Sequence, residues 1–146
     1  MIYLDTSYLT KIYTAESGSA EVIVWMTGKS DFVSCLHGRL ELVSSFKRHQ
    51  REGHLTQRDV TALIRRLEAD EAAELIAWLP CEAGLVHDAC AQTASLSSSV
   101  FLRAGDSLHL AAAAEAGLKE IYSHDRHLLA AAPHFGLKGV DVIKTP

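Results

Sequence analysis

The sequence predicts an α/β protein, folded as a three-layer α/β/α sandwich around a short, mainly parallel central sheet. Short apolar segments alternate along the chain with longer segments whose apolar residues recur at helical spacing. The apolar segments have no polar face, which is typical of parallel strands that helices cover on both sides. The chain has 146 residues and neither an internal repeat nor a linker. It is therefore expected to form a single domain, residues 1–146.

The first half of the chain is expected to contain two strands and three helices. Residues 1–4 are apolar and leave no room for a helix, so they predict a strand, and residues 31–35 are a second short apolar run. Residues 18–26 carry large apolar side chains on one side, and residues 36–51 repeat them at helical spacing. Residues 56–67 are amphipathic and begin with a threonine suited to cap a helix.

The second half is expected to continue this alternation. An apolar piece ending at Pro80 predicts a strand, and an alanine-rich helix is expected to stop before Gly117. Two further apolar runs near the end of the chain have the length of strands. The expected strands are residues 75–80, 120–123 and 139–143, and the expected helices are residues 85–96, 107–116 and 127–132.

Composition excludes several classes of protein. The chain has 48% hydrophobic and 22% charged residues, which is ordinary for a globular protein and argues against disorder. The longest uncharged stretch, residues 89–102, is too short to span a membrane, and the first residues lack a secretory leader pattern. The three cysteines, Cys35, Cys81 and Cys90, show no metal-type spacing. A reduced, cytoplasmic protein that does not contact membranes is therefore expected.

Charge is distributed unevenly along the chain. The formal net charge of −4 argues against a protein that merely coats nucleic acid. Residues 37–66 nevertheless hold seven basic and three acidic residues. Lys47, Arg48 and Arg51 form the densest part of this segment and are candidates to contact phosphates of a polyanion. A solvated helix face would have the same composition.

Four acidic residues are expected at one edge of the sheet. Asp5 directly follows the first strand, and Asp125 comes two residues after the strand at 120–123. Glu41 lies about two turns into the helix after the second strand, and Asp106 directly precedes the helix at 107–116. Functional groups in such sheets gather at the carboxyl ends of the strands. Each aspartate could instead cap a helix or occupy a turn.

Taken together, these acids favour a hard divalent cation. No matching arginine cluster is expected beside them, so mutual repulsion should raise the pKa of at least one carboxyl. Ligand sets made only of oxygen select Mg²⁺ or Mn²⁺ rather than zinc. A pair of such ions about 3.5–4 Å apart can activate water and neutralise charge during phosphodiester hydrolysis.

Sequence motifs add a family resemblance. The segments Met1–Ser7, Ala104–Ala112 and Ile121–Asp125, together with a Glu41-Leu42 step after a Phe-Val-Ser strand, resemble the pattern of PIN domains. Over essentially the whole chain, the sequence is similar to VapC-type toxins within that superfamily. The resemblance implies a Mg²⁺- or Mn²⁺-dependent endoribonuclease that hydrolyses RNA with metal-activated water. It also implies the toxin of a type II toxin–antitoxin pair, which binds a small antitoxin protein and forms a homodimer.

The resemblance also implies roles for individual residues, and the basic segment would then contact RNA. Asp125 matches the more variable fourth acid. One departure is Gly38, which costs about 1 kcal/mol inside a helix and predicts a loose turn before Glu41. The implied catalytic and metal-binding acids are Asp5, Glu41, Asp106 and Asp125, and the implied supporting hydroxyls are those of Thr6 and Ser123.

Two other functions are compatible with the sequence. A haloacid-dehalogenase-like phosphatase also begins with an apolar strand and an aspartate, but it would carry a second acid where this chain has Ser7. A non-catalytic PIN-like module that binds RNA or protein is the other alternative. His124 and His127 lack the partners of a zinc site, and His109 is expected on a helix face without a special role.

Overall fold

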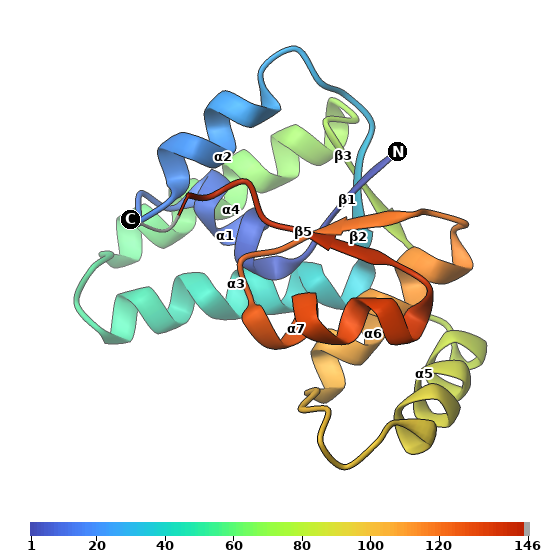
Figure 1. Ribbon diagram of the computed structural model, residues 1–146. Coiled ribbons are helices and arrows are strands. Elements are labelled where there is room, and N and C mark those ends of the chain that lie inside the picture. The colour runs from blue at the N-terminus through green and yellow to red at the C-terminus, as the bar shows by residue number, and fades with distance from the viewer. Residues whose placement is uncertain (145–146) are drawn as a thin grey trace.

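A computed structural model of the protein describes residues 1–144, so residues 145 and 146 of the predicted domain lie outside the described part. Within it, five strands form one sheet in the order β3-β2-β1-β4-β5, and every neighbouring pair is parallel. The sheet is short and β1 lies at its centre (Figure 1). The strands are β1 Ile2–Leu4, β2 Phe32–Cys35, β3 Ile76–Leu79, β4 Glu120–Tyr122 and β5 Lys138–Val140.

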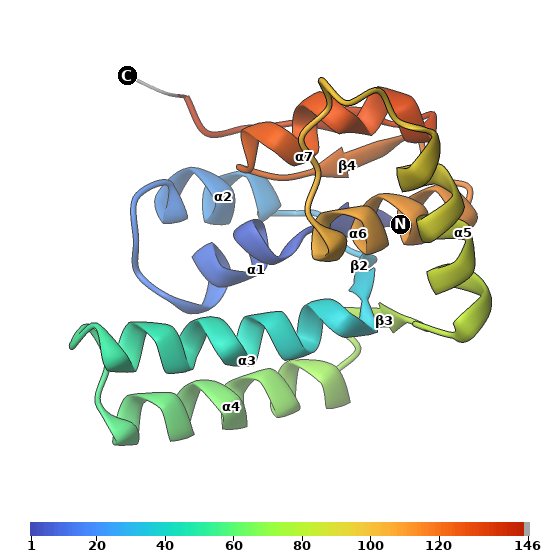
Figure 2. The same ribbon diagram turned by 90° about the horizontal axis from the view of Figure 1, so that it is seen from below.

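Helices cover both faces of the sheet (Figures 1 and 2), which confirms the predicted α/β/α class. Tyr3 packs into the core formed with α5, α6 and α7, whereas Leu4 packs into the core formed with α1 to α4. Side chains alternate along a strand, so these neighbours face opposite layers. The helices are α1 Thr6–Tyr13, α2 Ser19–Met26, α3 Leu36–Arg51, α4 Gln57–Ala72, α5 Ala83–Ser95, α6 Ala104–Glu115 and α7 Arg126–Ala131, with a 3₁₀ turn at Ala132–Phe135.

The sequence did not predict α1, and α4 extends five residues beyond its predicted end. The error that matters for the acids concerns α6. This helix begins at Ala104, and its N-cap is Arg103, so Asp106 lies in the first turn instead of preceding the helix. The first residues of a helix make no backbone hydrogen bond to an earlier turn, and Arg103 gives no capping signal in the sequence. Within residues 1–144, no helix is both long and apolar enough to cross a membrane.

The expected loose turn around Gly38 is absent, because α3 is continuous from Leu36 to Arg51. Gly38 is buried against α6, and a Cβ added to it would lie 2.8 Å from His109 Cε1 and 3.1 Å from Ser34 Oγ. The glycine is therefore explained by the close approach of α3 to α6.

Gly38→Ala is expected to destabilise the protein, whereas Gly84→Ala in the first turn of α5 is expected to stabilise it. Alanine is favoured over glycine inside a helix by up to about 1 kcal/mol, but position 38 has no room for a methyl group. Nothing lies within 4 Å of a Cβ built at position 84. Urea unfolding would measure both free energies. An increase in stability for Gly38→Ala would contradict the tight contact between α3 and α6.

Candidate active site

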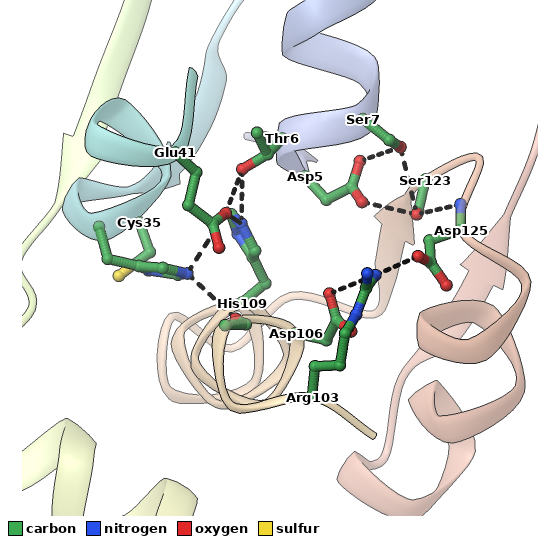
Figure 3. A network of polar contacts seen from close by, with 12 residues as sticks. Asp5, Thr6, Ser7, Cys35, Glu41, Arg103, Asp106, His109, Ser123 and Asp125 are labelled. Carbon is green, nitrogen blue, oxygen red and sulfur yellow. Dashed lines mark hydrogen bonds and ion pairs between the residues drawn. The ribbon is translucent and has the colours of Figure 1, made fainter. Parts of the chain in front are cut away.

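The four acids singled out in the sequence line one cleft of about 670 Å³ at the carboxyl edge of the sheet. Asp5 follows β1 and Asp125 follows β4, while Glu41 and Asp106 lie on α3 and α6. Figure 3 shows their side chains around the same space. The shared edge arises because β1, β2 and β4 are parallel, so their carboxyl ends meet there.

Asp5 forms one wall of the cleft and is only 4% exposed. Its carboxylate accepts hydrogen bonds from Ser7 Oγ (2.6 Å), Ser123 Oγ (2.7 Å) and the Tyr8 backbone amide (3.1 Å). The last bond makes Asp5 the N-cap of α1. Burial raises the pKa of Asp5 despite these donors. The sequence predicted a raised pKa for at least one of the acids, caused by repulsion between them. The main cause at Asp5 is instead desolvation of the carboxyl group by burial.

Glu41 faces Asp5 from α3. Its Oε2 accepts a hydrogen bond from Thr6 Oγ1 (2.5 Å) and lies 3.1 Å from His109 Nε2. Burial raises the pKa of Glu41, but His109 and the Thr6 hydroxyl outweigh that effect and lower the pKa to about 2. Glu41 is therefore ionised at neutral pH and held by two neighbouring side chains. Thr6 thus supports an acid, as the sequence implied.

His109 belongs to the site, and its expected placement on an unremarkable helix face was wrong. It is 1% exposed. Its Nε2 faces Glu41 Oε2, and an ionised carboxylate can only accept, so Nε2 carries a hydrogen. In the neutral ring, Nδ1 then accepts from the Tyr3 hydroxyl (2.9 Å), which itself accepts from the Cys35 amide (3.0 Å). The sequence offered one signal, because residues three apart share a helix face and Asp106 precedes His109 by three positions.

Arg103 lies between Asp106 and Asp125 (Figure 3), which corrects the expectation that no arginine would accompany the acids. Its Nε donates to Asp106 Oδ2 (2.8 Å), and its guanidinium also contacts Asp125. Asp125 additionally caps α7 through the His127 amide (2.7 Å). Burial raises the pKa of Asp125, but backbone amides and Arg103 reverse that shift and lower it.

Gly105 and His37 complete the wall beside Glu41. A Cβ added to Gly105 would lie 2.3 Å from Glu41 Oε1, so a larger residue here would displace the carboxylate from its described position. His37 Nε2 contacts the Gly105 carbonyl oxygen at 3.0 Å and lies 3.9 Å from Glu41 Oε2. Sequence reasoning missed both residues, because their roles depend on contacts between α3 and α6.

The three candidate RNA-binding residues of α3, Lys47, Arg48 and Arg51, do not all line the cleft. Arg48 and Arg51 line the acidic cleft, but Lys47 does not and instead contacts Gln50. Counted from Glu41, Arg48 and Arg51 are seven and ten residues along the helix, which places all three on one side. The cleft thus continues from the acids along a basic face of α3.

The side chains of the cleft fit a divalent cation. Four carboxylates line the cleft. Among residues 1–144, Arg103 is the only lysine or arginine that pairs with any of these carboxylates. No three of these acids have oxygens within 4.8 Å of one another, and Arg103 pairs with two of them in the described arrangement. The donors are all oxygens, and Gly105 leaves one oxygen of Glu41 space beside α6. Such a set suits a hard cation.

Fold and site together define a nuclease-like α/β domain with an acidic centre, and comparison with known proteins identifies its family. A PIN-domain profile matches residues 2–133. The chain therefore belongs to the PIN-domain family, whose members are metal-dependent nucleases. The sequence is 30% identical over 142 residues to Ribonuclease VapC47 of Mycobacterium tuberculosis, and the match covers 93% of each chain.

Solved structures share the fold at lower sequence identity. VapC20 of Mycobacterium tuberculosis, described as a toxin that cleaves the sarcin–ricin loop, has a TM-score of 0.70 at 16% identity and covers 90% of this chain and 95% of its own. FitAcB from Neisseria gonorrhoeae has a TM-score of 0.69 at 16% identity, with 97% and 98% of the two chains covered. These likenesses support the PIN fold.

Asp5→Asn is expected to stabilise the protein at neutral pH when no divalent cation is added. Because the pKa of Asp5 is raised in the folded protein, this carboxyl ionises at a lower pH in the unfolded chain, where its pKa has the ordinary value of about 4. The folded protein therefore loses stability as the pH rises from about 4 to the raised pKa of Asp5. Asparagine has a similar shape and no charge. The gain should be about 1.4 kcal/mol for each unit by which burial raises the pKa.

Thermal melts in EDTA, in acid and at neutral pH, would measure this effect. The exposed acid Asp88 on α5 provides a matched control, since Asp88→Asn should leave the pH dependence of the melting temperature as it is in the parent protein. The same pH dependence in Asp5→Asn as in the parent would contradict a buried, strained charge at position 5.

Proposed function

We propose that this protein is a Mg²⁺- or Mn²⁺-dependent endoribonuclease and the toxin of a toxin–antitoxin pair. The observation that carries the proposal is a single cleft lined by four carboxylates and, along α3, by two arginines. Carboxylates suit a hard cation, and arginines suit phosphates. The relative named Ribonuclease VapC47 supports RNA as the substrate, and VapC20, described as a toxin, supports the biological role.

The proposed ligands of the cation are Asp5, Glu41 and Asp106, with Asp125 as a fourth. A divalent cation supplies positive charge to the phosphodiester and makes water a better nucleophile. The hydroxyl of Ser123 holds one oxygen of Asp5 in place (2.7 Å). A cation held by Asp106 and Asp125 would compete with the guanidinium that now pairs with both carboxylates.

Other residues of the chain keep these acids charged and oriented. Thr6 and His109 hold Glu41 ionised, as its pKa of about 2 indicates. Arg48 and Arg51 would bind phosphates on one side of the scissile bond, where the cleft extends along α3. In this proposal, the four acids bind the metal ion, and the arginines of α3 bind the RNA substrate.

The phosphatase alternative has less support than the nuclease. Ser7 stands where such an enzyme would carry its second acid, and its hydroxyl donates to Asp5 Oδ1 (2.6 Å).

We further propose that residues 1–146 form one catalytic domain that acts in the cytoplasm, forms a homodimer and binds a small antitoxin protein. Exposed apolar side chains support protein contacts near the cleft. Leu40, which lines the cleft, is 71% exposed, and Phe101 is 58% exposed. Phe101 does not line the cleft but precedes the cleft-lining Arg103 by two residues. Isolated exposed apolar residues are common, but one in a charged cleft and another near it in the chain suit a protein partner.

RNA cleavage is expected only with Mg²⁺ or Mn²⁺, and Asp106→Asn is expected to abolish it. Because the cation binds the folded site, Mg²⁺ should raise the melting temperature of the parent and raise that of the variant much less. Asp88→Asn serves as the charge-matched control and should behave like the parent.

Cleavage by nuclease-free protein in excess EDTA would contradict the metal dependence. Equal Mg²⁺ responses in parent and Asp106→Asn would remove Asp106 from the proposed ligands. A Mg²⁺ response without cleavage of any RNA tested would favour the non-catalytic module.

Arg48→Ala combined with Arg51→Ala is expected to weaken RNA binding and to reduce its salt dependence. Each phosphate contact to single-stranded RNA contributes about 0.7 to the slope of log K against log salt concentration, so the slope should fall by about 1.4. Lys47→Ala, outside the cleft, should leave the slope unchanged. RNA-binding curves over a range of salt concentrations would measure the slope for both variants. A decrease in slope for Lys47→Ala as large as that for the double variant would show that RNA is attracted by general positive charge and not by contacts in the cleft.

A further inference from the structure

A second cluster of potential metal ligands lies next to the acidic cleft. Cys35 ends β2 and is the N-cap of α3, His37 lies in the first turn of α3, and Cys81 follows β3. Parallel pairing places Cys35 beside Leu79, so the segment after β3 passes the start of α3. One donor atom each from Cys35, His37 and Cys81 lie within 4.8 Å of one another.

His37 has one ring nitrogen free for a metal ion. Its Nε2 contacts the Gly105 carbonyl oxygen (3.0 Å), and that oxygen can only accept, so Nε2 carries the hydrogen. In the neutral ring Nδ1 then keeps an unshared electron pair. Nδ1 is one of two buried side-chain polar atoms within residues 1–144 that have no hydrogen-bond partner. Leaving a buried acceptor unpaired costs roughly 1–3 kcal/mol.

We propose that Cys35, His37 and Cys81 form a binding site for a thiophilic divalent cation, Zn²⁺, distinct from the oxygen-lined cleft. Two sulfurs and one imidazole nitrogen form a donor set that zinc takes and that Mg²⁺ does not favour. Three protein ligands leave a fourth position for water or another small ligand. The sequence indicated no such site, because Cys81 is distant in the chain and only the pairing of β2 with β3 brings it near.

The same two thiols could instead be oxidised to a disulfide, but the surroundings favour a metal ion. A disulfide would leave His37 Nδ1 buried and unpaired, whereas a metal ion would bind that nitrogen together with both sulfurs. Cys35 is fully buried while Cys81 is partly exposed, so a metal ion can reach the cluster from the side of Cys81.

Zinc at this position would fix the ring that separates the two sites. With Nδ1 bound to metal, the Nε2–H group points to the Gly105 carbonyl, the kind of outer partner that orients a metal-bound histidine. The ring centroids of His37 and His109 are 4.3 Å apart. The metal would therefore tie the ends of β2 and β3 to the start of α3 and help position the wall that carries Glu41.

Titration of reduced, chelator-treated protein with Co²⁺ tests the proposal, because cobalt replaces zinc and thiolate ligation gives an intense near-ultraviolet absorption band. The parent should bind one Co²⁺ with this band, and Zn²⁺ should displace it. Cys81→Ala, which keeps the Cys35 thiolate, should show a weaker band and bind Co²⁺ roughly 10–100-fold more weakly, a range that loss of even an outer partner can produce. Cys90→Ala, which removes an exposed thiol on α5, is the matched control and should keep the band.

Asp106→Asn should also keep the band, which separates this site from the acidic cleft. No thiolate band in the parent, or an unchanged band in Cys81→Ala, would overturn the proposal. Loss of two free thiols per chain without bound metal would show a disulfide instead. If Cys81→Ala does not fold, His37→Gln replaces it, since that variant keeps both thiols and must still bind the metal more weakly.

Discussion

The carboxylate of Asp5 is buried at the end of the central strand, and the rest of the site depends on satisfying its charge. Its three hydrogen-bond donors come from the start of α1 and from the end of β4. Without such donors, a buried carboxylate would be protonated or would destabilise the fold. The same group therefore caps α1, ties that helix to the β1–β4 pair, and places its carboxyl group in the wall of the cleft.

The opposite wall depends on the close approach of α3 and α6. Gly38 and Gly105 leave out the two methyl groups that would separate these helices, one beside the His109 ring and one beside Glu41. His109 can then stabilise the Glu41 carboxylate while Tyr3, from the central strand, holds its other nitrogen. The two walls differ as a result: burial raises the pKa of Asp5, whereas hydrogen bonds and the nearby imidazole lower that of Glu41.

Much of the fold and the positions of the acids could be predicted from the sequence. Short apolar runs without a polar face occur only where both sides of a strand are covered, so they predicted the layered parallel sheet. Asp5 follows such a run directly and Asp125 comes shortly after another, which placed them at one edge without any knowledge of contacts. The order of acids and motifs also predicted the PIN-domain family. That the acids bind metal is still a prediction.

By itself the sequence determined the alternation of short strands with most of the helices, and which end of the sheet carries the acids, because these follow from local periodicity and strand direction. Helix α1, Thr6–Tyr13, was not among the predicted helices. Only the tertiary structure decided the partners: Arg103 between two acids, His109 against Glu41, Arg48 but not Lys47 in the cleft, and Cys81 beside Cys35. Apart from the Arg103–Asp106 pair at the start of α6, each of these joins elements distant in the chain. Side-chain partners of that kind depend on the packing of whole helices, to which local sequence preferences contribute little.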